Sequence, residues 1–145
     1  MTGIDLRLLT DEELPSILPL LQQTYLHLSE QCLRARLAVM PAQGYRCVGA
    51  FTTEGTLIGI SGIWLRTHLW CGLMVEPDNV VVDAAWRSTG VGHALVQWIL
   101  ARGRTHGAEV SDLNCYVTNS AAHAFWMREG YRIVGFHFQQ PLASS

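Results

Sequence analysis

The sequence contains no lysine, because all 10 of its basic residues are arginine. A Walker phosphate loop needs a lysine directly after its last glycine, so that nucleotide-binding motif is excluded. A lysine Schiff base and a Ser-Lys catalytic pair are excluded for the same reason.

Metal-binding and redox motifs are also missing. Cys32, Cys47, Cys71 and Cys115 are too widely spaced for a C-x-x-C motif, and no two of the six histidines stand four residues apart. We therefore expect no bound metal. We expect the four cysteines to be reduced, buried thiols.

Long apolar runs and charged blocks are scarce as well. Hydrophobic residues make up 49% of the chain, yet no uninterrupted apolar span has membrane length, and the first residues lack the pattern of a signal peptide. We expect a cytoplasmic protein without a membrane partner. The 10 basic and 12 acidic residues give a net charge of −2 without a basic block, which disfavours nucleic-acid binding.

The 145 residues are enough for one domain with a single core, which we assign to residues 1–145. The apolar excess predicts a well-filled core or an apolar subunit interface.

The most informative stretch of the chain runs from Asn79 to Leu100. Val80, Val81 and Val82 are β-branched and predict a central strand that is covered on both faces. The turn that follows has the sequence Arg87-Ser88-Thr89-Gly90-Val91-Gly92. A helix begins at once, with apolar residues at Val91, Leu95, Trp98 and Ile99.

This strand, turn and helix predict an anion site. A glycine turn at a helix N-terminus directs unpaired backbone N–H groups and the positive end of the helix dipole into one small space, which suits a phosphate. Arg87 adds a planar cation that can bind a phosphate through two hydrogen bonds. His93 is either a further phosphate donor or an ordinary surface histidine. A dinucleotide fingerprint is excluded, because the glycine spacing and its acidic partner are both missing.

The spacing Arg-x-x-Gly-x-Gly after a Val-Val-Val-Asp strand resembles the signature of the GNAT superfamily of acetyl-coenzyme A dependent N-acetyltransferases. The resemblance implies that the backbone around Val80, Val81 and Val82 binds the pantetheine arm of acetyl-coenzyme A. It also implies that the turn binds the pyrophosphate, through Arg87, Ser88, Thr89, Gly90, Val91, Gly92 and His93.

A second segment, from Asn119 to Tyr131, resembles the other diagnostic stretch of that family. The resemblance implies coenzyme contacts for Asn119, Phe125 and Trp126. Asn119 is also suited to cap the helix that follows it. Because two spaced motifs occur in the expected order, the family assignment is stronger than either motif alone allows.

The expected fold is that of the family, an α/β (α+β) domain. It has a mostly antiparallel mixed sheet of six to seven strands, splayed parallel central strands, and helices on both faces. Periodicity and turn signals predict strands at Ile4–Leu8, Tyr45–Thr52, Leu57–Leu65, Leu73–Asp83, Val110–Val117 and Tyr131–Phe138. Helices are expected after a Thr10–Glu13 capping box, from His27 to Met40, from Val91 to a stop at Gly103 and Gly107, and after Asn119. The sheet edge at the C-terminus is a natural surface for a homodimer.

Two carboxylates precede the central valines. Glu76 is our candidate for the base that takes a proton from an acceptor amine, and Asp78 is the second candidate. Either residue can equally be a solvated carboxylate at the start of a strand. With a period of two and no bulge, Glu76, Asp78, Val80 and Val82 share one face of the strand. By resemblance, the N–H of Val82 or a close neighbour polarises the thioester carbonyl.

The general acid cannot be assigned from the sequence. The family position that is commonly a tyrosine is Trp126, and an indole cannot protonate a leaving thiolate. Tyr116, His123 and Tyr131 are alternatives, or the thiolate leaves without help. The expected function is acetyl transfer from acetyl-coenzyme A to a primary amine of a small molecule or peptide. A non-catalytic sensor of acyl-coenzyme A is the alternative.

Overall fold

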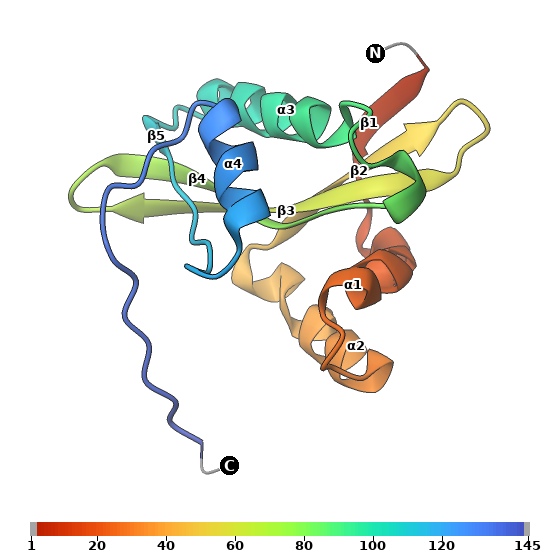
Figure 1. The fold of residues 1–145 in the computed structure, drawn as a ribbon, viewed down its shortest axis with the longest axis horizontal. Helices are drawn as coiled ribbons and strands as arrows, with labels where there is room; N and C mark the ends of the chain where they lie inside the picture. The colour runs from red at the N-terminus through yellow and green to blue at the C-terminus, as the bar shows by residue number, and fades with distance from the viewer. Residues whose placement is uncertain (1–2, 144–145) are drawn as a thin grey trace. The chain divides into compact units, whose positions relative to one another are not determined.

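The computed structural model describes residues 3–143, which form two compact units, residues 3–113 and residues 114–143. The first unit contains a sheet in the order β1-β2-β3-β4-β5 (Figure 1). Its strands are β1 (Ile4–Leu8), β2 (Arg46–Thr52), β3 (Leu57–His68), β4 (Gly72–Val82) and β5 (Val110–Ser111). The pairs β1–β2, β2–β3 and β3–β4 are antiparallel, and β5 runs parallel to β4.

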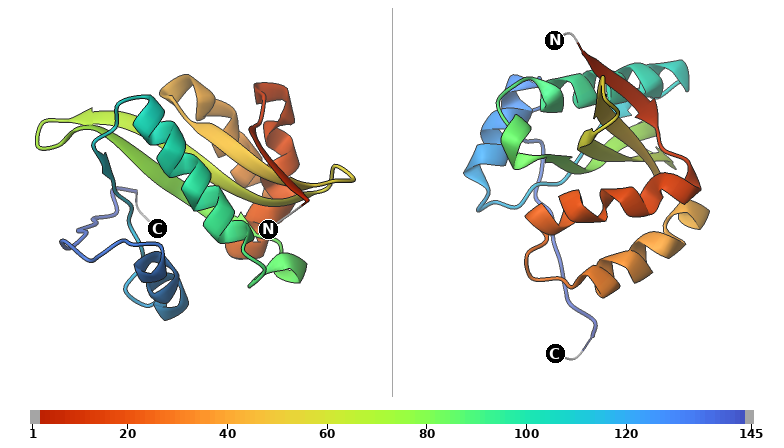
Figure 2. Two further views of the ribbon diagram at one scale, coloured as in Figure 1. Left: turned by 90° about the horizontal axis from the view of Figure 1, so that it is seen from above. Right: turned by 90° about the vertical axis from the view of Figure 1, so that its right-hand side faces the viewer.

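Helices cover both faces of this sheet. Helix α3 (Val91–Thr105) lies on one face, whereas α1 (Leu18–Thr24) and α2 (Glu30–Val39) lie on the other (Figure 2). The mixed, mostly antiparallel sheet and its two helical layers confirm the expected fold class. The number of strands is lower than expected, because the part of the chain described here contains five.

The core is divided by the sheet. Ile60 and Val81 face α1 and α2 and pack with Ile17, Leu21 and Leu37. The opposite cluster lies under α3 and joins Val48, Ile63 and Val75 to Val91, Leu95 and Ile99. The expected burial of the valine run on both faces is only partly right. Val81 is 3% exposed, whereas Val80 and Val82 are half-buried.

The predicted capping box is present at the start of the first helix. The backbone N–H of Thr10 donates to Glu13 Oε1 at 3.0 Å, and that of Glu13 donates to Thr10 Oγ1 at 3.3 Å. Hydrogen bonds from Arg7 are the main reason why the pKa of Glu13 is lowered to about 2. The first seven residues form a 3₁₀ segment, η1 (Asp11–Ile17), and the α-helix begins at Leu18. Pro15 lies within η1, where it has no N–H to donate to the helix.

Helix α3 continues past the predicted stop at Gly103. An added Cβ at Gly103 would lie 2.6 Å from Val75 Cγ1, so this glycine allows the helix to pack closely on β4. The helix ends at Thr105, and Gly107 follows with φ of +84°. The prediction that Gly103 ends the helix is therefore wrong, because the role of this glycine depends on Val75, 28 positions earlier in the chain.

A close contact between Gly59 of β3 and the first turn of α3 gives a prediction about stability. An added Cβ would lie 2.8 Å from Val91 Cγ1 and 3.3 Å from Leu95 Cδ1. Because both side chains are fully buried, we expect Gly59→Ala to lower the free energy of unfolding by about 1 to 3 kcal/mol. Urea denaturation measures this. Gly135→Ala is the control, since no atom lies within 4 Å of its added Cβ, and equal stability of the two variants would contradict the prediction.

The second unit, described by itself, contains α4 (Ser120–Arg128). The predicted strand Tyr131–Phe138 is wrong for this structure, because the segment is in no strand. Its residues Ile133, Phe136 and Phe138 are 74%, 89% and 92% exposed. Alternation gives a strand two faces, but a strand also needs a hydrogen-bonded neighbour. The predicted strand Val110–Val117 is likewise shortened to Val110–Ser111.

The prediction of four buried thiols is correct only for Cys47. All four cysteines are free, and burial raises the pKa of the Cys47 thiol to about 12. Cys32, Cys71 and Cys115 are half-buried.

Candidate functional site

The turn between β4 and α3 is exposed and tightly folded. Residues 84–90 are all exposed, Ser88 has φ of +61°, and Gly90 has φ of +94°. Asp83 Oδ1 accepts a hydrogen bond from the N–H of Ala85 at 2.9 Å, and Thr89 Oγ1 donates to the carbonyl of Trp86. These local bonds hold the turn in shape.

Gly90 is the N-cap residue of α3, and no side chain caps this helix. The N-cap side chain usually satisfies one of the first N–H groups of a helix. Here the cap is a glycine in the left-handed region, so no Cβ stands between those N–H groups and a ligand. The start of a 15-residue helix without a side-chain cap is suited to bind a phosphate group.

The side chain of Arg87 is exposed and anchored beside this turn. Its Nε donates to the carbonyl oxygen of Val82 at 3.3 Å. Because this bond uses Nε, it holds the guanidinium next to Val82, the last residue of β4. Arg87 and the glycine turn therefore lie together at the end of β4. That they bind a phosphate stays a prediction.

On the β5 side, no strand of the described residues pairs with β4 beyond Val75, so this side of β4 is open there. In the described part of the chain, β5 pairs with Met74 and Val75, and the last bond across this pair runs from the Asp112 N–H to the Val75 carbonyl at 3.2 Å. The carbonyls of Leu73 and Val75 both accept hydrogen bonds from the β5 side. Backbone groups alternate between the two sides of a strand, so the backbone nitrogen of Pro77, which carries no hydrogen, also lies on the β5 side. A proline is tolerated there because no ladder bond is required.

Val80 and Val82 line this open side with their backbone groups. The N–H of Asp83 donates to the carbonyl of Ile58 at 2.8 Å, and Val81 lies opposite Ile60. The backbone groups of Val81 and Asp83 therefore point toward β3. Their neighbours Val80 and Val82 therefore turn their N–H and C=O groups away from β3. Val81 is bonded toward β3 and buried in the core. It is the least suited of the three valines to contact a ligand.

A β-bulge at Asn79 changes which residues share a face. Between the pairs Ile60↔Val81 and Gly62↔Asp78, β4 contains one residue more than β3, and Asn79 has φ of +53°. The predicted common face of Glu76, Asp78, Val80 and Val82 is therefore wrong. Glu76 and Asp78 share the α1 face with Val81, because the extra residue reverses the alternation. Pro77 pairs regularly with Ile63, so the bulge begins only after Asp78.

Both candidate carboxylates are engaged on the α1 face. Glu76 Oε1 lies 2.7 Å from Arg66 Nη2, and the Glu76 side chain is 18% exposed. Asp78 Oδ2 accepts a hydrogen bond from Trp64 Nε1 at 2.9 Å. These contacts fix two negative groups directly before the bulge, on the face opposite α3.

Two tyrosines meet the bulge from elsewhere in the chain. Asn79 Nδ2 donates to the hydroxyl of Tyr25 at the end of α1, and the Tyr45 hydroxyl donates to Asn79 Oδ1 at 3.5 Å. Burial raises the pKa of Tyr45, which keeps its hydroxyl a donor. The sequence analysis missed Tyr25, Tyr45 and Asn79. No local pattern identifies them, because their contacts depend on the tertiary fold.

In the second unit, Asn119 caps α4, with Oδ1 accepting from the Ala122 N–H at 3.1 Å. Trp126 packs edge-on against Phe125 and Tyr131, with ring centroids 4.9 and 5.1 Å apart. His123 Nε2 lies 2.8 Å from the Tyr116 carbonyl oxygen. The predicted coenzyme contacts of Asn119, Phe125 and Trp126 remain predictions, and the general acid remains unassigned.

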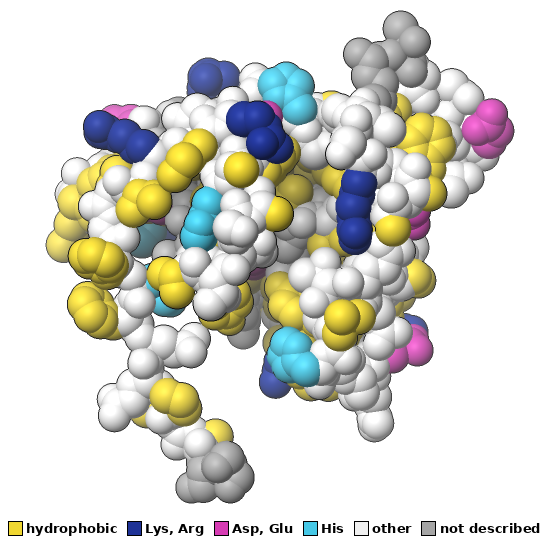
Figure 3. All heavy atoms as spheres, in the orientation of Figure 1, with side chains coloured by type: hydrophobic (Ala, Val, Ile, Leu, Met, Phe, Trp, Pro, Cys, Tyr) yellow, Lys and Arg dark blue, Asp and Glu magenta, His cyan; other side chains and the backbone are white. Residues whose placement is uncertain are grey.

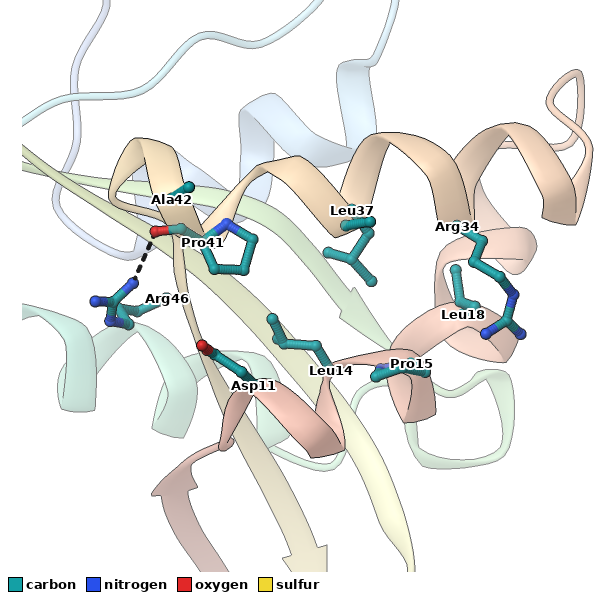
Figure 4. Close-up of a pocket in the computed structure, with 10 residues that line it drawn as sticks. Asp11, Leu14, Pro15, Leu18, Arg34, Leu37, Pro41, Ala42 and Arg46 are labelled. Atoms are coloured by element: carbon teal, nitrogen blue, oxygen red, sulfur yellow. Dashed lines mark hydrogen bonds between the residues drawn. The ribbon is translucent and has the colours of Figure 1, made fainter.

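A groove of about 530 Å³ lies outside this region (Figure 4). It runs between η1 and α2 and is lined mainly by apolar residues, among them Leu14, Leu18 and Leu37, with Arg46 at one end. None of its lining residues belongs to β4 or to the turn after it. The groove is therefore separate from the candidate site.

Within residues 3–143, no group of three or more His, Cys, Asp or Glu side chains could hold a metal ion. In the same range no helix has the length and apolar character needed to cross a membrane. On the face seen in Figure 3, arginine side chains occur singly and form no basic block.

Comparisons with known proteins agree with one another. A family model described as "Acetyltransferase (GNAT) family" matches residues 11–131. The curated aminoalkylphosphonate N-acetyltransferase of Salmonella typhimurium is 30% identical over 93 residues, which are 61% of this chain and 58% of that protein. The match thus spans less than two thirds of that relative.

Solved structures share the fold across nearly the whole chain. An acetyltransferase of Trypanosoma brucei has a TM-score of 0.75 at 23% identity, covering 96% of this chain and 99% of its own. The aminoglycoside N-acetyltransferase AAC(6')-Iy in complex with CoA has a TM-score of 0.81 at 16% identity, with 97% and 95% covered. At these identities the likeness concerns the fold alone.

Proposed function

This chain belongs to the acetyltransferase (GNAT) family, and we propose that it transfers the acetyl group of acetyl-coenzyme A to a primary amine. The acceptor is a small molecule or a peptide, and the amine attacks the thioester directly in a ternary complex. One observation carries this proposal. The open side of β4 leads straight into a turn that combines a glycine-capped helix with Arg87.

The residues at this site suit coenzyme A. The N–H groups from Gly90 to His93 and the guanidinium of Arg87 would hold the pyrophosphate, with Ser88 and Thr89 shaping the turn. The N–H and C=O groups of Val80 and the C=O group of Val82 would pair with the amide groups of the pantetheine arm, as a neighbouring strand does in a sheet. The N–H of Val82 is then left for the thioester. When bound, acetyl-coenzyme A supplies the activated acetyl group.

The chain's own groups stabilise the charge that develops on the thioester, take up a proton from the amine and hold the two reactants together. Backbone N–H groups of the open strand, with Val82 first among them, donate to the thioester oxygen as negative charge develops there. Glu76, or else Asp78, takes a proton from the attacking amine. As the carbon–nitrogen bond forms, the carbon–sulfur bond breaks and its electron pair stays on the sulfur, which finally takes up a proton. Holding the two reactants together supplies most of the rate.

Replacing Arg87 by alanine tests the phosphate site. We expect Arg87→Ala to weaken coenzyme A binding by about 1 to 3 kcal/mol, because a charge-assisted hydrogen bond is lost. Titration calorimetry measures the change directly. Arg104→Ala is a matched control, since Arg104 is an exposed arginine in the last turn of α3. Equal affinity of Arg87→Ala and the wild type would remove Arg87 from the site.

The reaction is tested by following thiol release from acetyl-coenzyme A with a panel of primary amines and peptides. Small amines come first, because the curated relative is named for an aminoalkylphosphonate acceptor. Release with at least one acceptor supports the enzyme. Trp126 at the usual tyrosine position favours the second candidate, a sensor of acyl-coenzyme A. Binding of the coenzyme without turnover of any acceptor would support that sensor.

Dimerisation and a cytoplasmic location remain expectations of the sequence. The single-domain assignment is likewise a proposal, in which residues 1–145 form one acetyltransferase domain.

A further inference from the structure

Arg66 is an exposed cation that the protein holds in place on the α1 face of β3. Its side chain is 60% exposed, and its Nη2 lies 2.7 Å from Glu76 Oε1. Its guanidinium carbon also lies 5.7 Å from the centre of the Trp64 ring. Among the described residues, Arg66 donates a hydrogen bond to Glu76. Because the side chain is 60% exposed, the remaining N–H groups of the guanidinium are available to a ligand.

The register of the sheet places opposite charges on one face. Trp64 lies opposite Glu76, and Arg66 lies opposite Met74, so all four side chains project from the same side of the hairpin. Asp78 is on this side too, since it receives the Trp64 indole N–H. Two carboxylates and one fixed guanidinium therefore border the same surface directly before the bulge.

This arrangement differs from an ordinary surface ion pair. In the Arg34–Glu30 pair on α2, which also measures 2.7 Å, the two side chains are 55% and 56% exposed. In the Arg66 pair the carboxylate is only 18% exposed. The guanidinium is thus held over a largely covered anion and an aromatic ring. If a ligand carries a second positive charge besides its amine, that charge is repelled by Arg66. A negatively charged group on the ligand would instead accept hydrogen bonds from Arg66.

We propose that the acceptor is a small amine that also carries an acidic group, and that Arg66 is the specificity-determining residue that binds this group. The inference rests on the proposed function, with the amine at Glu76 or Asp78. A zwitterion of this class presents its ammonium to the carboxylates and its carboxylate or phosphonate to Arg66. A diamine places a second positive charge against Arg66 and is disfavoured.

Acceptors of similar length and different tail charge test the proposal. The probes are 2-aminoethylphosphonate and β-alanine, with anionic tails, propylamine, with a neutral tail, and ethylenediamine, with a cationic tail. We expect kcat/KM to be about tenfold to a hundredfold higher for an anionic probe than for propylamine. Arg66→Gln should remove this preference, and Arg66→Lys should keep part of it. Arg34→Gln is the matched control and should leave the preference unchanged.

The ratio between acceptors matters more than the absolute rate, because any effect of Arg66 on Glu76 changes the rate with every probe. An unchanged ratio in Arg66→Gln would overturn the proposal, and so would a wild-type preference for propylamine or ethylenediamine. Binding of coenzyme A without turnover of any probe would overturn it as well. Failure to bind coenzyme A would instead remove the proposed function itself.

Discussion

Glu76→Gln is expected to lower kcat by about 10²- to 10⁴-fold, the range that a positioned general base contributes. Glutamine has nearly the same shape and retains an oxygen for Arg66, but it cannot take a proton from the amine. Steady-state kinetics with a reactive acceptor measure kcat, and calorimetry measures coenzyme A binding. Affinity for the coenzyme should be unchanged, because Glu76 faces α1 and not the open side of β4.

Two further variants make this experiment specific. Glu30→Gln removes an equivalent partner of an arginine on α2 and should leave kcat unchanged. Asp78→Asn tests the second candidate, whose carboxylate is bonded to Trp64. A large loss in Asp78→Asn with a fully active Glu76→Gln would transfer the role of base to Asp78. Full activity of both variants would contradict a carboxylate base on this strand.

Val82→Pro is expected to lower kcat by about 10²- to 10³-fold, as removal of one oxyanion donor does in other enzymes. Proline removes the N–H of residue 82, which faces away from β3 and so takes no part in the ladder with that strand. The thioester oxygen would thereby lose its backbone donor.

Val82→Ala is the matched control for this change, since it shortens the side chain but keeps the N–H. We expect kcat of the alanine variant to stay within about threefold of the wild type, because Val82 is only half-buried. Thermal unfolding checks that both variants fold. Equal losses in the two folded variants would mean that the side chain matters, and would contradict a role for the Val82 N–H.

Local features of the fold could be predicted from the sequence. The Thr10–Glu13 capping box depends on residues three positions apart, and its two bonds are present. The turn after Thr52 closes through a 2.9 Å bond from the Thr52 N–H to the Thr56 carbonyl, with Gly55 at φ of +86°. The strand, turn and helix around Arg87 could be predicted for the same reason, because each depends on residues that are close together in the sequence.

Features that depend on distant residues could not be predicted. The bulge at Asn79 arises from its register with β3, and its amide bonds to Tyr25, 54 positions earlier in the chain. Gly103 was misread because Val75 determines its role. The segment Tyr131–Phe138 alternates like a strand, yet alternation does not specify a partner strand. The period of two therefore predicted correctly which residues of β4 share a face only as far as the bulge at Asn79.

The acceptor is the part of the site about which the sequence said least. The turn proposed to bind coenzyme A is a continuous motif. The α1 face, in contrast, is assembled from different segments of the chain, which contribute Tyr25, Tyr45, Trp64 and Arg66. Among the solved structures that share this fold, identity is as low as 16%. The sequence can therefore change on one scaffold, and we propose that the residues of this face determine which acceptor binds.

The central claim is that a diphosphate binds the bare backbone donors at the start of α3. A crystal structure of the protein with coenzyme A tests it most directly. We predict pyrophosphate oxygens within hydrogen-bonding distance of the N–H groups between Gly90 and His93, with the pantetheine arm along Val80 and Val82. A bound coenzyme with its pyrophosphate at any other place, and this turn without a phosphate, would contradict the account.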